Sequence, residues 1–97
     1  MSYDIDLGDK AEFNITYNVS YMFYDLFPEG IRAINGTSGS KGTTILSNIR
    51  WNIEDKYTEF KAKEPENGWG TVESTLKVLN KMIIKSLEYP NEVWECD

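Results

Sequence analysis

The sequence has no histidine and only one cysteine, Cys96, among its 97 residues. Histidine is the commonest metal ligand and a common general base, so its absence excludes histidine-dependent triads, zinc hydrolase motifs and two-histidine iron sites. A single cysteine excludes an intrachain disulfide and a cysteine-based zinc site. We therefore expect no metal and no cofactor. We expect Cys96 to be a small apolar residue of a final strand rather than a nucleophile.

Long apolar runs are also missing. No stretch reaches the roughly 18 apolar residues that identify a membrane-spanning helix. The first residues, Met1–Asp6, carry acids instead of the basic segment and apolar stretch of a signal peptide. We therefore expect a cytoplasmic protein without a membrane partner.

Basic residues are few, with 10 Lys and Arg against 16 Asp and Glu, and the net charge is −6. This charge disfavours attraction to the phosphates of duplex nucleic acid, which we do not expect as a partner. Two interpretations of the acids remain open. The charge keeps a small domain soluble, or an acidic surface meets a basic partner.

The length and the 40% apolar content predict a single globular domain over residues 1–97. Two segments near the start alternate apolar and polar residues, as strands do. They cover residues 3–7, which could instead be a frayed terminus, and residues 13–19. A third strand is predicted over Glu92–Cys96, and we place it beside Phe13–Tyr17.

Helical spacing of apolar residues predicts a short helix over Tyr21–Phe27 and two long helices. The long helices carry two stripes of apolar side chains: Ile45, Ile49, Ile53, Tyr57 and Phe60 in the first, and Val72, Leu76, Leu79, Ile83 and Leu87 in the second. The predicted fold is α+β in the order β-β-α-α-α-β. A small antiparallel sheet packs on an antiparallel helical hairpin.

The segment Glu64–Gly70 is predicted to join the two long helices. Pro65 disfavours helical dihedrals at the residue before it, and Asn67-Gly68 tolerates a positive φ. Thr71 then offers an N-cap for the second helix. Trp69 has two interpretations, as a hydrophobic plug of the turn or as a stacking surface for a base or a partner.

A glycine-rich segment, Asn35–Thr44, opens into the first long helix. Consecutive backbone N–H groups at Gly39 and Ser40, with Lys41 nearby, could cradle a phosphate or carboxylate. The residue order is not that of a nucleotide-hydrolysing P-loop, since Gly42 follows the lysine. The alternative is a surface loop with a threonine N-cap.

Aromatic residues crowd the short helix. Tyr21 and Tyr24 share one face, and Phe23 and Phe27 share a neighbouring one. One pair could line a groove beside Arg32 that accepts a nucleotide or a protein anchor, or the aromatic residues could simply fill the core. The residues predicted to bind a ligand are therefore Lys41, Arg32, Gly39, Ser40, Tyr21, Tyr24 and Trp69.

Four segments, spread in order over residues 13 to 95, carry a resemblance: Phe13–Phe23, Gly30–Gly39, Pro65–Gly70 and Tyr89–Trp94. Together they resemble a family of small uncharacterised proteins from phages, prophages and bacteria, with the Asn-Gly-Trp-Gly turn as the most specific piece. The resemblance implies a phage accessory gene, hence the host cytoplasm, and it carries over no activity. The chain departs from the pattern at residues 38 to 42 and in its acidic start.

Three functions remain open. The first is a non-catalytic phage accessory protein that counters host defence by binding a host protein or by sequestering a nucleotide signal. The second is an assembly accessory that oligomerises through exposed aromatic residues. The third is a small carboxylate-dependent enzyme, but no nucleophile and base pair can be named, so we expect no catalytic residues.

Overall fold

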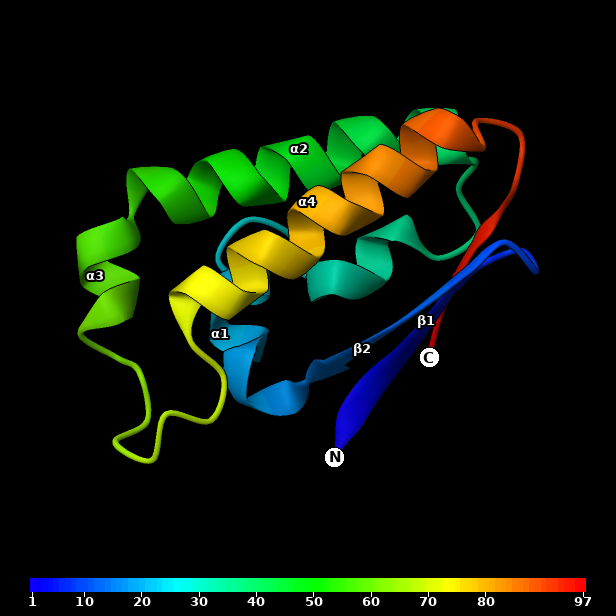
Figure 1. Ribbon diagram of the computed structural model, residues 1–97. Helices are drawn as coiled ribbons and strands as arrows, with labels where there is room; N and C mark the ends of the chain where they lie inside the picture. The colour runs from blue at the N-terminus through cyan, green and yellow to red at the C-terminus, as the bar shows by residue number, and fades with distance from the viewer.

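The computed structural model describes all 97 residues and shows three strands and four α-helices. Two 3₁₀ segments, Tyr17–Val19 and Gly30–Ile34, connect them. The strands are β1 (Ser2–Leu7), β2 (Ala11–Thr16) and β3 (Trp94–Cys96), and the helices are α1 (Ser20–Tyr24), α2 (Gly39–Asp55), α3 (Tyr57–Lys61) and α4 (Val72–Glu88). Figure 1 shows α2 and α4 running antiparallel in a layer above the sheet. The predicted α+β class is confirmed.

The sheet is antiparallel with the strand order β2-β1-β3. The predicted pairing of the last strand with residues 13–17 is therefore wrong, because β3 pairs with β1. Strand β1 is central and not a frayed terminus. Its apolar residues Tyr3, Ile5 and Leu7 are all buried beneath the helices, which explains why β1 takes the central place.

The second strand ends at Thr16, earlier than predicted. The Thr16 hydroxyl accepts a hydrogen bond from the Asn18 N–H at 3.3 Å and so begins a 3₁₀ turn. This turn buries Val19 and leads directly into α1. Helix α1 ends at Tyr24, before the predicted Phe27.

Helix α2 begins inside the segment predicted as a glycine-rich loop. Its N-cap is Ser38 rather than a threonine, since the Ser38 hydroxyl accepts from the Lys41 N–H at 3.1 Å. At its other end the helix breaks at Lys56, whose φ of −103° and ψ of 24° turn the chain into α3. Beyond this break Phe60 is buried but Tyr57 is 38% exposed, so the predicted stripe does not continue on one face.

Helix α4 begins at the predicted cap. The Thr71 hydroxyl accepts from the Ser74 N–H at 3.0 Å, and the Ser74 hydroxyl accepts from the Thr71 N–H at 3.2 Å. The buried face is rotated from the predicted one, because Leu87 is 63% exposed while Thr75, Met82 and Ser86 are buried. The core lies between this face, α2 and the inner side of the sheet.

The turn before α4 has Gly68 at a φ of +71°, as its Asn-Gly sequence predicts. Trp69 is 65% exposed, so its interpretation as a hydrophobic plug is wrong.

We expect Gly68→Val to lower the free energy of unfolding by about 1–3 kcal/mol, because a β-branched residue is strained at positive φ. Gly68→Asn is the control, since asparagine tolerates this conformation. Urea unfolding measures both, and a Gly68→Val protein as stable as the parent would contradict this account.

The ends of α3 and α4 are tied together by charged groups. Lys61 Nζ lies 2.6 Å from Glu73 Oε1, and the Tyr57 hydroxyl donates to the same oxygen at 2.6 Å. Glu64 Oε1 accepts from the Val72 N–H at 2.8 Å and so caps α4. These contacts hold the hairpin of helices closed at the end where the chain reverses.

Hydrogen bonds from Lys61 and then Tyr57 lower the pKa of Glu73 from its usual 4.5 to about 2. A carboxylate with a lowered pKa stabilises the fold above its unfolded pKa, and this contribution is lost as the pH falls. We expect the free energy of unfolding of the parent to fall more between pH 4.5 and pH 2 than that of Glu73→Gln. Urea unfolding across this range is the measurement. Glu66→Gln, which removes the same charge at an acid outside the ion pairs, is the charge-matched control.

Candidate functional site

The residues predicted to form an anion cradle lie in the first turn of α2 and are already engaged. Four hydrogen bonds use their backbone N–H groups: Gly39 N to Glu92 O at 2.7 Å, Ser40 N to Pro90 O at 3.0 Å, Lys41 N to Ser38 Oγ at 3.1 Å, and Gly42 N to Ser38 O at 2.7 Å. A helix N-terminus binds an anion through unsatisfied N–H groups, and none remains here. The predicted backbone cradle is therefore not formed.

Arg32 and Tyr24 do come together, in a shallow pocket of about 350 Å³. The Arg32 guanidinium lies over the Tyr3 ring at 4.8 Å from its centroid and over the Tyr17 ring at 5.9 Å. Tyr24 is 48% exposed at the rim. Tyr21 belongs elsewhere, since its hydroxyl donates to the Phe60 carbonyl at 3.2 Å. The arginine is thus held by cation–π contacts within the protein.

Trp69 lies in a second place, beside β2 and the first turns of α4. The seven residues predicted to bind a ligand are thus divided. Arg32 and Tyr24 share one pocket, Trp69 lines another, and Gly39, Ser40 and Lys41 line neither. The structure does not gather them into a common site.

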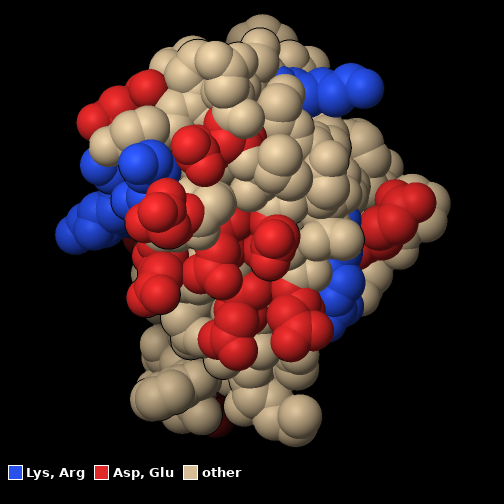
Figure 2. Space-filling model, turned by 90° about the vertical axis from the view of Figure 1, so that its right-hand side faces the viewer, with Lys and Arg blue, Asp and Glu red and all other residues tan.

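The outer side of the sheet carries a different set of side chains. Because side chains alternate along a strand, the residues between the buried Tyr3, Ile5 and Leu7 face away from the helices. Five carboxylates gather there on all three strands and at the C-terminal residue: Asp4, Asp6, Glu12, Glu95 and Asp97. We call this surface the acidic sheet face. Figure 2 shows acidic side chains across the middle of this side of the molecule and basic ones at its margins.

The strand register sets like charges opposite one another. Asp6 is paired with Glu12 on one side and with Glu95 on the other. Gly8 N bonds to Val93 O, and Asp97 N bonds to Asp4 O. Every second pair of an antiparallel ladder is hydrogen-bonded, so Asp6 and Glu95, which lie midway between these two pairs, are also a hydrogen-bonded pair. On its other side, Asp6 and Glu12 form the non-hydrogen-bonded kind of pair, in which side chains approach more closely. Like charges in such positions destabilise a sheet.

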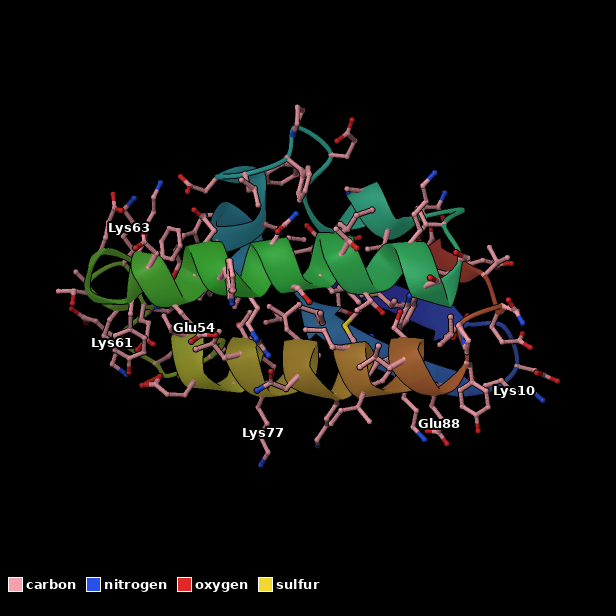
Figure 3. The ribbon with its side chains drawn as sticks, turned by 90° about the horizontal axis from the view of Figure 1, so that it is seen from above. Lys10, Glu54, Lys61, Lys63, Lys77 and Glu88 are labelled. Carbon is pink, nitrogen blue, oxygen red and sulfur yellow. The ribbon has the colours of Figure 1, made fainter.

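No basic side chain forms an ion pair with the carboxylates of this face. The six ion pairs of the structure involve none of its five carboxylates. Of the ten Lys and Arg residues only Lys10 lies on the β1–β2 hairpin, and it pairs with Asp9 at 3.6 Å. Figure 3 shows Lys61, Lys63 and Lys77 projecting from the helical layer. The one hydrogen bond to any of the five carboxylate groups is donated by Asn14 Nδ2 to Asp4 Oδ1 at 2.9 Å.

None of these carboxylates is among the residues that the sequence predicts to bind a ligand. The signal was present in part, because Asp4 and Asp6 alternate with buried residues in Tyr3–Leu7, and Glu95 lies between the buried Trp94 and Cys96. Its meaning depends on strand order. Only the central place of β1 brings residues 6, 12 and 95 into one row.

A groove of about 750 Å³ lies between the C-terminal half of α2 and the segment that follows α1. Its apolar wall includes Trp51, which is 69% exposed, and Leu26, which is 42% exposed. Glu54 and Asp55 form its acidic rim. This groove is separate from the acidic sheet face, since the two share no residue.

The chemistry available to the remaining groups is limited. Cys96 is 6% exposed, and burial raises the pKa of its thiol to about 11. No three His, Cys, Asp or Glu side chains are placed to hold a metal ion together. None of the helices combines the length and the apolar character needed to cross a membrane. Comparison of the chain with protein-family models, with curated proteins and with solved structures finds no match.

Proposed function

We propose that this is a non-catalytic binding protein that docks its acidic sheet face onto a basic surface of another protein. The observation that carries the proposal is the row Glu12–Asp6–Glu95, in which like charges lie opposite one another and none of the three forms an ion pair. This arrangement costs folding stability in the free protein. A partner that supplies Lys or Arg side chains would offset this cost on binding and would be selected by charge complementarity.

The partner we propose is a host defence protein, met in the host cytoplasm by the product of a phage accessory gene. The resemblance over residues 13 to 95 supports the phage origin. A basic surface is typical of proteins that bind nucleic acid. The partner class that fits best is therefore a defence protein whose nucleic-acid-binding surface would be covered by the acidic sheet face.

The other hypotheses have less support. The nucleotide hypothesis depends on a backbone cradle for phosphate. That cradle is not free, because the N–H groups of Gly39 and Ser40 already bond to the segment after α4. Assembly through aromatic residues would use the Trp51 groove. Its rim is acidic and each copy carries a net charge of −6, so two copies would repel.

A pair of triple variants tests the proposal. The sheet variant combines Asp6→Asn, Glu12→Gln and Glu95→Gln. The control variant combines Glu29→Gln, Asp55→Asn and Glu66→Gln, which lie off the sheet and outside the ion pairs. Both change the net charge from −6 by the same three charges. Because the sheet variant removes two like-charge pairs, we expect it to be at least as stable as the parent, so lost binding could not be attributed to unfolding.

Proteins retained by the parent from host cells expressing a defence system would be identified by mass spectrometry, purified and titrated calorimetrically. We expect the sheet variant to bind at least about 10-fold more weakly, since several rim charge pairs are lost. The control variant should bind like the parent, and added salt should weaken the parent's binding. Equal binding by the sheet variant and the parent would refute the proposal.

A further inference from the structure

One edge of the sheet is closed by the chain itself. The residues before α2 lie along the outer edge of β3 and bond to it. The bonds are Gly36 N to Trp94 O at 2.8 Å, Trp94 N to Thr37 O at 2.8 Å and Cys96 N to Asn35 Oδ1 at 2.9 Å. A bridge between Ser38 and Val93 extends the contact. No further strand can be added on this side.

The other edge, β2, is open. The bond from Tyr17 N to Met1 O at 3.2 Å fixes which residues of β2 point their backbone groups toward β1. By alternation these are Ala11, Phe13 and Ile15. The N–H and C=O groups of Glu12 and Asn14 therefore point away from the sheet, and no turn or loop bonds to them. The strand carries no lysine or proline, which often protect such an edge.

The two sides of this edge differ in chemistry. On the inner side a groove of about 300 Å³ separates β2 from α4. Its apolar lining is Ile15, Val19, Val78 and Trp69, and the rest of its lining is Asn14, Thr16, Gly70, Ser74 and Thr75. The exposed Trp69 ring is thus part of its wall. On the outer side lie the exposed Glu12 and Asn14 side chains of the acidic sheet face.

We propose that β2 accepts an extended segment of the partner protein as a fourth strand, and that this segment alternates basic and apolar residues. This inference rests on the proposed function and describes how the partner is held. Residues opposite Glu12 and Asn14 would lie on the outer side and be basic. Residues opposite Phe13 and Ile15 would lie on the inner side, where Ile15 lines the groove, and be apolar. Main-chain hydrogen bonds would supply affinity, and the alternating side chains would supply specificity.

Charge decides between this segment and a second copy of the chain. Pairing β2 with the β2 strand of another copy would place two acidic sheet faces side by side in one sheet. Each copy brings a net charge of −6, so the joined face would repel itself. A basic segment instead brings opposite charges beside Glu12.

The test uses the full chain labelled with nitrogen-15 and the peptide Ac-Lys-Val-Lys-Val-Lys-Val-amide as the probe. We expect amide exchange at Glu12 and Asn14 to slow by about 10-fold or more at saturation, since a strand would then protect these groups. Phe13 and Ile15, already bonded to β1, should change less. The control is the same peptide methylated on the backbone nitrogen of each lysine. It keeps every charge but cannot donate the main-chain hydrogen bonds to β2, so it should bind at least about 10-fold more weakly.

A matched pair of variants tests the same edge from the protein side. Asn14→Ala and Asn14→Pro both remove the amide side chain, but only proline removes the N–H. Because that N–H points away from β1, proline leaves the β1–β2 ladder intact. We expect the alanine variant to bind the peptide and the proline variant to lose it.

Two results would overturn the inference. Equal binding of the two peptides without slower exchange at Glu12 and Asn14 would show attraction by charge alone, and the proposed function would survive. No binding of the unmethylated peptide would reject strand addition. The proposed function fails separately, if the sheet variant binds the purified partner as tightly as the parent does.

Discussion

Replacing Gly39 with alanine is expected to lower the free energy of unfolding by about 3 kcal/mol, since new atoms in a well-packed site force the backbone to shift. A Cβ atom at this position would lie against the Tyr89 carbonyl oxygen, 2.8 Å from the Ser86 carbonyl oxygen and 3.0 Å from Pro90 Cα. All three belong to the backbone, so none can rotate away. In an exposed helix the same change would stabilise, which makes the sign of the effect informative.

Ser40→Ala is the control for this prediction, because Ser40 is exposed in the same turn of α2. We expect its effect to stay within about 0.5 kcal/mol, as for most surface substitutions. Urea unfolding followed by circular dichroism measures both variants. A Gly39→Ala protein as stable as the control would mean that the end of α4 does not pack on α2 as closely as the structure has it.

The sequence predicts the glycine-rich segment as a loop, but its second half forms the start of α2. Glycine and serine lower helix propensity, and Asn35–Thr44 is rich in both. A helix forms there because the chain after α4 packs onto it and bonds to its first N–H groups. That partner is distant in sequence, so no local pattern could reveal it. A small residue in this position meets the need for close contact and does not indicate a ligand.

Elements with local causes were predicted well. Thr71 caps α4 through its own neighbours, and Gly68 takes its positive φ from an Asn-Gly turn. Strand order was predicted wrongly because it depends on which strand pairs with a neighbour along both of its edges, and here that strand is β1. The acidic sheet face was not predicted for the same reason. Asp4 and Asp6 alternate with apolar residues in the sequence, but Glu12 and Asp97 lie outside the predicted strands. The alignment of residues 6, 12 and 95 in one row required the pairing of β1 with both neighbours.

Trp94→Ala is expected to lower the free energy of unfolding by about 3–5 kcal/mol, the usual cost of emptying a buried aromatic site. Trp94 is 0% exposed and lies where β3, α2 and α4 meet. A Cβ atom added at Gly42 would lie 2.5 Å from its ring, so the ring fills the space that glycine leaves. Thermal unfolding followed by circular dichroism is the measurement, because the substitution itself changes the tryptophan fluorescence. Leu87→Ala, at an exposed site of α4, is the control and should change stability little.

The hydrogen bonds of Trp94 separate packing from polar pairing. Trp94 Nε1 donates to Ser86 Oγ at 3.1 Å, and the Ser86 hydroxyl donates in turn to the Gly39 carbonyl. Ser86→Ala leaves the buried indole N–H without a partner, which costs about 1–3 kcal/mol. Trp94→Phe removes that donor, so Ser86→Ala should cost less in the Trp94→Phe background than in the parent. Additive losses in this double-mutant cycle would contradict a coupled chain of hydrogen bonds linking β3 to α4 and to the start of α2.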